Sequence, residues 1–415
     1  MIGFWKHGIG LRSVALLVVM LMSALVLACG ANGDVQAEPT RVVLQATEVV
    51  VPTSVPIEVH TPTATTVVVA TLAPTLTAVI ATDVPAATST VPAPTSTVSA
   101  PTAVEGVFDV GRFADVPGIV DPSNFDWPRS IETSEGVITL ESPPERVHSL
   151  SLGHSEILAA LVDFDRLAAV YSFFVDEEQS NIAVLSAEAT LIGFAPEEVV
   201  ALEPEVIIAS RFTNADTVAL MKGANIPVAR TSLENSALGN VPNILLIGYM
   251  IGAEVEAIEL ADEIERRMRV IADALPDGEK PQVLSVSKWT SAFAAGSGTT
   301  EGRIIEQSGG INAAADSGIE GHQQVSIESI AAINPDVIIV PQPLEGANTF
   351  IEELTSSLAL AEVPAVRDGQ IFYVLPRYHT TLSHWNVRGV EELAAMLYPS
   401  AFEGVVFEEF ANFGE

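Results

Sequence analysis

Aromatic, basic and hydroxyl side chains recur directly after the short apolar segments of this sequence. Only 6% of the residues are aromatic, so their concentration at these positions favours a binding role. Rings stack on flat or bulky ligands, and guanidinium groups bind the oxygen atoms of an anion in bidentate fashion. The candidate ligand-binding residues are His154, Ser155, Tyr171, Phe173, Arg211, Phe212, Trp289, Thr290, Arg377, Tyr378, His379, Trp385 and Arg388.

Several of these residues also fit ordinary structural roles. Phe173 could belong to a core, and Arg211 or Arg388 could be paired with one of the many carboxylates. His379 and His384 in "HTTLSH" come nearest to a pair of metal ligands, but their spacing is not that of a zinc motif. We therefore expect no metal site and no resident cofactor, and haem iron bound by His or Tyr stays open.

Composition and missing motifs exclude two classes of function. The formal net charge is -34, from 19 basic and 53 acidic residues, and such a surface repels nucleic acid. The sequence has no G-x-S-x-G and no H-E-x-x-H motif, and the glycine-rich "GSGTTEGR" at 296–303 lacks the lysine of a phosphate-binding P-loop. We expect a monomer that is not an enzyme, although the amides of 296–303 could still bind an anion.

Parallel strands are the elements that would position the candidate residues. The segments 146–151, 166–172 and 204–210 are predicted strands with helical patterns between them, and strands resume at 282–287. This alternation predicts α/β sheets, whose ligands bind beyond the carboxyl ends of the strands. The candidates follow those ends, so we expect two facing sheets to enclose the ligand.

An internal repeat indicates two similar halves. "EEVVALEPEVII" begins at Glu197, and "ESIAAINPDVII" begins at Glu328, 131 positions later. Between them, residues 241–276 have helical periodicity. We expect two Rossmann-like lobes, each with a mostly parallel sheet, joined by one long helix. The predicted parts are a leader and hairpin at 106–144, an N-terminal lobe at 145–240, the interlobe helix at 241–276, and a C-terminal lobe with an acidic tail at 277–415.

The start of the chain has the pattern of a secretory signal. Lys6 and Arg12 precede an apolar stretch at 14–27, and "VLAC" at 26–29 resembles the lipobox of bacterial lipoproteins. We expect a lipoprotein signal peptide at 1–28, lipidation of Cys29, and a position on the outer face of the cytoplasmic membrane; a plain signal-anchor helix is the alternative. The Thr/Pro/Val-rich segment at 29–105 is typical of a disordered stalk.

Five ordered segments resemble one known family. They are "PPERVHSLSLGHSEILAAL", "PEEVVALEPEVIIAS", "AAGSGTTEGRIIEQSGGINAAA", "VSIESIAAINPDVIIVP" and "VPAVRDGQIFYV", between residues 143 and 374. The pattern is similar to the substrate-binding proteins of ABC importers for iron complexes and cobalamin. The resemblance implies a ligand held between two lobes and delivered to a membrane permease.

The same resemblance implies a docking role for one surface glutamate on each lobe. The positions that match are Glu197 and Glu328, with Glu198 as an alternative for the first. A carboxylate in the first turn of a helix also complements the helix dipole, by about 0.3–1 kcal/mol, so a structural role is compatible with docking.

The combined expectation is a lipid-anchored, extracytoplasmic protein that captures an iron complex, first of all a ferric siderophore, for an ABC importer. Haem and cobalamin are alternatives of the same class. A surface sensor or adhesin on a long stalk is an alternative outside transport. Because a continuous helix resists bending, we expect a largely pre-formed cleft.

Overall fold

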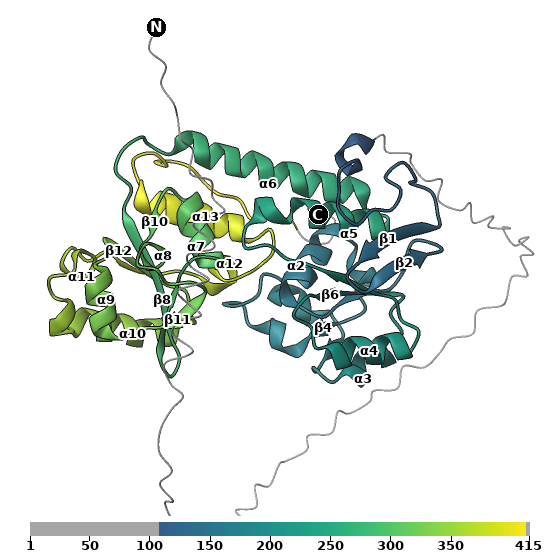
Figure 1. The fold of residues 1–415 in the computed structure, drawn as a ribbon, viewed down its shortest axis with the longest axis horizontal. Helices are drawn as coiled ribbons and strands as arrows, with labels where there is room; N and C mark the ends of the chain where they lie inside the picture. The colour runs from purple at the N-terminus through teal and green to yellow at the C-terminus, as the bar shows by residue number, and fades with distance from the viewer. Residues whose placement is uncertain (1–107, 412–415) are drawn as a thin grey trace, which may run out of the picture. The chain divides into compact units, whose positions relative to one another are not determined.

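The computed structural model describes residues 108–411. The predicted signal peptide, Cys29 and the linker at 29–105 lie outside the described residues. The described part consists of two α/β lobes, and a long helix, α6 (Glu254–Ala274), runs alongside both of them (Figure 1). No helix in residues 108–411 is both long enough and apolar enough to cross a membrane.

The N-terminal lobe is built on a parallel sheet of three strands in the order β3-β6-β7, with a parallel pair β4-β5 beside it. An antiparallel hairpin, β1-β2, precedes the lobe, as predicted from 106–144. The elements are η1 (Val110–Phe113), β1 (Arg129–Thr133), β2 (Gly136–Leu140), β3 (Val147–Ser149), α2 (Leu152–Leu161), η2 (Phe164–Arg166), β4 (Val170–Tyr171), η3 (Ser172–Val175), η4 (Ala183–Ala187), β5 (Leu191–Ile192), α3 (Pro196–Ala201), β6 (Val206–Ser210), α4 (Ala215–Gly223) and β7 (Val228–Thr231).

The C-terminal lobe has one larger sheet in the order β11-β9-β8-β12-β13, and β10 also pairs with β8. The pairs of β8 with β10 and β12, and of β12 with β13, are parallel, whereas β9 and β11 form an antiparallel edge. The elements are β8 (Gln282–Lys288), β9 (Ala292–Ala295), α7 (Thr300–Gln307), β10 (Ile311–Asn312), α8 (Ala313–Asp316), β11 (His322–Gln324), α9 (Ile327–Ile333), β12 (Val337–Val340), α10 (Leu344–Ser356), η5 (Leu358–Leu360), α11 (Pro364–Arg367), β13 (Ile371–Tyr373), α12 (Pro376–His379) and α13 (Asn386–Leu397).

The repeat occupies equivalent places in the two sheets. In the first lobe Val147 of β3 lies opposite Val206 of β6, and in the second lobe Val283 of β8 lies opposite Val337 of β12. The short helices α3 and α9 precede β6 and β12 in the same way. The prediction of two similar α/β lobes is confirmed.

Alternation along the repeated strands explains why the same apolar letters occur twice. Successive side chains of a strand point to opposite faces. Ile207 of β6 packs in a hydrophobic core formed by the first lobe alone, and Ile338 of β12 packs in a core formed by the second lobe alone. Their neighbours Val206 and Val337 both belong to one continuous core that also contains residues of α5 (Ala237–Ile251), α6 and α13. Each sheet therefore lies between a core of its own and a core shared by both lobes.

The prediction of one continuous helix over 241–276 is wrong. The helical stretch consists of α5 and α6, which pack closely enough that a Cβ on Gly248 would lie 2.3 Å from Cβ of Ala257. Gly252, with φ +72°, ends α5 in a left-handed conformation. A glycine in this conformation is a common helix C-cap, and one such residue leaves the apolar periodicity almost unchanged. The helix that runs along both lobes is α6 alone.

Replacement of Gly252 by alanine should destabilise the protein. The left-handed backbone costs an L-residue about 1–2 kcal/mol, and the new Cβ would lie 3.3 Å from Cζ2 of Trp127. Urea unfolding of the full chain should give a lower midpoint for Gly252→Ala. Gly223→Ala at the end of α4 is the control, because its Cβ meets no atom within 4 Å. Equal midpoints for Gly252→Ala and the unsubstituted chain would contradict this explanation of the break.

Candidate functional site

Loops that follow strands of one sheet contact loops that follow strands of the other. Oε2 of Glu178, beyond β4 and η3, accepts a hydrogen bond of 3.1 Å from the backbone N–H of Leu344, which follows β12. The backbone N–H of Arg377, which follows β13, donates to the carbonyl of Glu178 at 3.0 Å. The carboxyl edges of the two sheets therefore face each other, as predicted for the ligand site.

Exposed aromatic rings lie at the carboxyl edge of the N-terminal lobe. Phe173 follows β4 and is 58% exposed, and Phe194 follows β5 and is 65% exposed. Their ring centroids are 6.1 Å apart, and Phe194 stacks on the buried ring of Tyr171 at 4.9 Å. Burial raises the pKa of Tyr171 to about 12, so its phenol is protonated at neutral pH. Phe173 is thus a surface residue, and Tyr171 supports the cluster from below.

Phe194 was missed in the sequence because β5 is only two residues long. The signal was "LIGF" at 191–194, an apolar pair followed by glycine just before the helix α3. Since β4 and β5 are paired in parallel, the residues after both strands come to one edge.

Arg211 supplies a positive charge beyond β6. Its guanidinium carbon lies 4.7 Å from the ring centroid of Phe212, which is 75% exposed. Within residues 108–411 we find no hydrogen bond or ion pair of the Arg211 side chain, so the alternative that it is paired does not hold there. A hollow of about 420 Å³ is lined by Arg211 together with Arg230 and Ser232, and by the acidic residues Glu132 and Glu234. An anion could approach this guanidinium without breaking an existing ion pair.

Trp289 and Thr290 are the exposed candidates of the C-terminal lobe. They follow β8, and Trp289 is 68% exposed. The preceding residue, Lys288, is held by Glu353 of α10 and, through its backbone, by Gln342. The base of the loop is thus fixed while the indole ring stays open to solvent.

His154 and Ser155 lie inside the N-terminal lobe, so the structure does not support ligand contacts for them. The ring nitrogens of His154 are 2.7 Å from Oγ of Ser151 and 2.8 Å from Oγ1 of Thr231. Burial lowers the pKa of His154 to about 3, so the ring is neutral. The Ser155 hydroxyl is 2.6 Å from that of Ser149. The helix α2 begins at Leu152, and its first turn points these side chains into the core.

Tyr378, His379, Trp385 and Arg388 are buried as well, and all but His379 contact residues Glu409 or Phe410 of the C-terminal tail. The Tyr378 hydroxyl donates to Glu409 at 2.8 Å, and Arg388 is paired with Glu391 at 2.9 Å. After α12 the chain turns into α13, which packs against α6, and proximity in sequence to β13 did not reveal this turn. The structure therefore brings together only part of the predicted set of ligand-binding residues. In residues 108–411 no group of three or more His, Cys, Asp or Glu could hold a metal ion.

Arg377 serves as a connection between the lobes. Its Nη1 donates to the carbonyl of Glu177 at 2.9 Å, and its own carbonyl accepts from Nδ2 of Asn181 at 2.8 Å. Nη2 of Arg377 donates to the Tyr378 hydroxyl at 3.0 Å, so its guanidinium is bonded on both sides and is less available to a ligand than that of Arg211.

A buried carboxylate, Glu156 of α2, joins the two lobes from within. Its Oε1 accepts from the backbone N–H and the Nδ2 of Asn181, at 3.0 and 2.8 Å. Its Oε2 accepts from the hydroxyls of Thr381 and Ser383, at 2.6 and 2.5 Å. Burial raises the pKa of Glu156, and the hydrogen bonds act in the opposite direction. This role could not be predicted from the sequence, because the glutamate looks like a polar position of an amphipathic helix.

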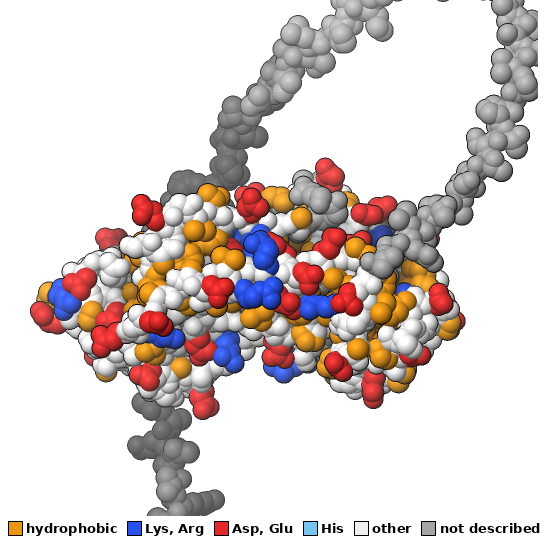
Figure 2. All heavy atoms as spheres, turned by 90° about the horizontal axis from the view of Figure 1, so that it is seen from above, with side chains coloured by type: hydrophobic (Ala, Val, Ile, Leu, Met, Phe, Trp, Pro, Cys, Tyr) orange, Lys and Arg blue, Asp and Glu red, His pale blue; other side chains and the backbone are white. Residues whose placement is uncertain are grey.

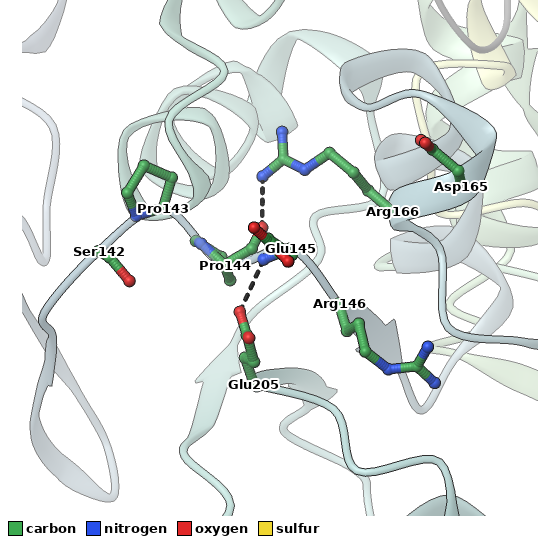
Figure 3. A pocket seen from close by; sticks show the side chains of 8 residues that line it. All are labelled: Ser142, Pro143, Pro144, Glu145, Arg146, Asp165, Arg166 and Glu205. Atoms are coloured by element: carbon green, nitrogen blue, oxygen red, sulfur yellow. Dashed lines mark hydrogen bonds between the residues drawn. The ribbon is translucent and has the colours of Figure 1, made fainter. Parts of the chain in front are cut away.

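The hollow drawn in Figure 3 lies at the opposite edge of the first sheet. It measures about 760 Å³ and is lined by residues 142–146, Arg166 and Glu205, among others. Glu145 and Glu205 come just before β3 and β6, so this hollow is at the amino ends of the strands. Arg166 donates to the carbonyl of Pro144 at 2.8 Å, and Glu205 accepts from the N–H of Glu145 at 2.6 Å. We therefore do not assign the ligand to it.

The two predicted docking glutamates are exposed in equivalent helices. Glu197 lies in the first turn of α3 and Glu328 in that of α9. Both helices are on the side of the described part away from α6 (Figure 1). A hydrogen bond with Ser326 lowers the pKa of Glu328. Glu198 accepts from the N–H of Gly193 at 2.8 Å, which leaves Glu197 as the freer of the two neighbours.

The face over α6 has a different character. Figure 2 shows Lys and Arg side chains along the middle of this face, with acidic side chains beside them. The ion pairs there include Arg112 with Glu265 at 2.9 Å and Arg266 with Glu263 at 2.7 Å. These charges neutralise one another locally, whereas Glu197 and Glu328 have no ion pair within residues 108–411.

Comparisons with known proteins agree with this architecture. Residues 147–378 match the family described as "Periplasmic binding protein". A "Cobalamin-binding protein" of Halobacterium salinarum is 28% identical over 243 residues, which cover 57% of this chain and 63% of the relative. The chain thus spans less than two thirds of that relative's length.

Two further matches extend over more of the partner protein. An "Uncharacterized ABC transporter substrate-binding lipoprotein YvrC" of Bacillus subtilis is 25% identical over 279 residues, 66% of this chain and 86% of the relative. The crystal structure of a periplasmic haem-binding protein from Pseudomonas aeruginosa superposes with a TM-score of 0.53 at 25% identity, over 62% of this chain and 94% of that one.

Two substitutions of Glu156 should distinguish the stability that comes from its hydrogen bonds from the stability that depends on its ionisable carboxyl group. Glu156→Ala leaves buried donors without an acceptor and should cost about 3 kcal/mol or more in the free energy of unfolding. Glu156→Gln keeps the size and should cost less. Because the folded carboxyl has a raised pKa, its favourable contribution is complete below the ordinary value of 4.5 and is lost as pH rises through the folded pKa. The stability of Glu156→Gln relative to the unsubstituted chain should therefore improve with increasing pH in denaturant titrations; a difference that does not change with pH would contradict the buried carboxylate.

Proposed function

The chain belongs to the periplasmic binding protein family, and on this premise we propose that it captures a metal chelate between the carboxyl edges of its two lobes and delivers it to an ABC importer. The chelate is cargo, so no resident cofactor is needed. A ferric siderophore is the first candidate. The family is one of binding proteins, in line with the prediction that the chain is not an enzyme.

The observation that carries the proposal is the pairing of exposed rings with an unpaired cation at the strand edge. Phe173 and Phe194 offer stacking surfaces on one lobe and Trp289 on the other, and Arg211 can bind oxygen atoms of an anionic chelate. In a chain of net charge -34, an anionic ligand needs such a local positive group.

Cobalamin is the second candidate, supported by the printed name of the Halobacterium relative. A corrinoid is also flat and bulky, so the same rings suit it. Haem held by an iron–histidine or iron–tyrosine bond is less well supported, because His154, Tyr171 and Tyr378 are buried. The exposed ring of His322 is already bonded to Glu301 at 3.0 Å.

Affinity measurements with defined chelates test the ligand proposal. Ferric dicitrate, cyanocobalamin and haemin, titrated separately, should quench the tryptophan fluorescence, and less so in Trp289→Phe, if they bind at this edge. Arg211→Ala should weaken binding of an anionic chelate by roughly tenfold or more, since a hydrogen bond to a charged group contributes about 1.5–3 kcal/mol. Arg367→Ala is the matched control, because Arg367 is exposed and paired with Asp368. An equal loss in both variants, or none in Arg211→Ala, would count against the site.

Delivery to a permease would use Glu197 and Glu328, one on each lobe, as carboxylates that bind two basic sites and fix the orientation. The anchor would be lipidated Cys29, and the protein would act as a monomer on the outer face of the cytoplasmic membrane. A surface sensor or adhesin of the same fold would bind ligand without supporting uptake.

Charge reversal distinguishes docking from binding. The double variant Glu197→Lys/Glu328→Lys should abolish uptake into vesicles that carry the cognate permease and leave ligand affinity unchanged. The control Glu259→Lys/Asp273→Lys makes the same change of charge on exposed positions of α6 and should keep uptake. Uptake that survives the first double variant would refute the docking assignment.

A further inference from the structure

A short acidic turn of the first lobe reaches across to the second lobe at the ligand edge. The turn comprises residues 176–181, "DEEQSN". Asp176 shapes it, because its side chain accepts hydrogen bonds from the N–H of Glu178 and from Nε2 of Gln179, both at 2.9 Å. The turn is therefore a defined element, which we call the bridge turn.

The root of the bridge turn is buried. Ser180 is 1% exposed and Asn181 is 8% exposed. Asn181 is bound both to Glu156 of its own lobe and to the carbonyl of Arg377 of the other. This end of the turn cannot leave the second lobe without exposing several satisfied polar groups.

The tip of the bridge turn is held differently. Glu178 is half-buried, and its carboxylate accepts a hydrogen bond of 3.1 Å from the N–H of Leu344, the first residue of α10. The residue before α10 is Pro343, and no side chain caps the helix from within its own lobe. Glu178 thus supplies from across the edge an acceptor and a negative charge that the amino end of α10 lacks.

We propose that Glu178 is a latch that holds the two ligand edges together in the unliganded protein. Its root is fixed, and the Glu178 side chain makes a single contact at a solvent-accessible place, where such contacts are weak. The backbone carbonyl of Glu178 is held separately, by the N–H of Arg377 at 3.0 Å. The contact of the Glu178 side chain with Leu344 can therefore open while Asn181 remains bound to both lobes. The role of this opening in ligand entry rests on the proposed function, but the latch itself does not.

Glu177 provides a matched comparison. It is the neighbouring residue, has the same charge and is exposed. Only its backbone carbonyl contacts the second lobe, through Nη1 of Arg377. Removal of its side chain should leave the contact between the lobes unchanged.

Distances between spin labels on the two lobes test the latch. Ala219→Cys on α4 and Asn348→Cys on α10 place one label on each lobe, in the full chain with Cys29→Ala so that no other thiol is present. Glu178→Ala should broaden the distance distribution and shift it to longer distances. Glu178→Gln retains an acceptor oxygen and should stay closer to the original distribution, and Glu177→Ala should leave it unchanged.

Two outcomes would overturn the latch. One is a distribution for Glu178→Ala that superimposes on the original. The other is an equal shift for Glu177→Ala, because the effect would then reflect loss of charge in the turn. A protein that opened as expected and yet bound no chelate would refute the proposed function and leave the latch intact.

Discussion

The core shared by the two lobes is the constraint on which the rest of the structure depends. Val206 and Val337, from equivalent strands of different sheets, are buried in the same apolar cluster with α5, α6 and α13. Apolar surface of this kind cannot be exposed without a large loss of free energy, so neither sheet can turn far from α6. The relative position of the two carboxyl edges follows from this packing, and Glu156 reinforces it with two hydrogen bonds to the second lobe.

The two-lobe architecture could be predicted because it depends on patterns within short stretches of the sequence. Apolar alternation, helical periodicity and the repeat at Glu197 and Glu328 can each be recognised in a single sequence. The break at Gly252 could not be seen in the same way, since one left-handed residue reverses the chain while the apolar spacing continues on both sides. Glycine followed by a first-turn Glu254 was the available signal.

The site was predictable only to the level of strand ends. Phe173, Arg211 and Trp289 are exposed at the expected edge. His154 and Tyr378 follow strands equally closely, but the first turn of α2 and the tail residue Glu409 place them inside the protein. Such directions depend on contacts between residues that are distant in sequence, and Tyr378 and Glu409 are 31 positions apart. The role of Glu156 was hidden for the same reason, since its hydroxyl partners come from residues 381 and 383.

The shared core and the weak contact at the edge have different roles in the contact between the lobes. The core and the root of the bridge turn keep the lobes in register, so the residues proposed to bind the ligand, the exposed rings and Arg211, would need little rearrangement. The contact of the Glu178 side chain with Leu344 is one of the interlobe contacts that solvent reaches. This arrangement suits a protein that binds its cargo and then releases it to a partner.

Hydrogen exchange of the full chain, with and without a chelate that it binds, tests the central claim most directly. Ligand held between the carboxyl edges should protect the backbone amides that follow β4, β5, β6 and β8, on both lobes in the same complex. Protection confined to one lobe, or to residues 142–146 at the amino edge, would contradict the account.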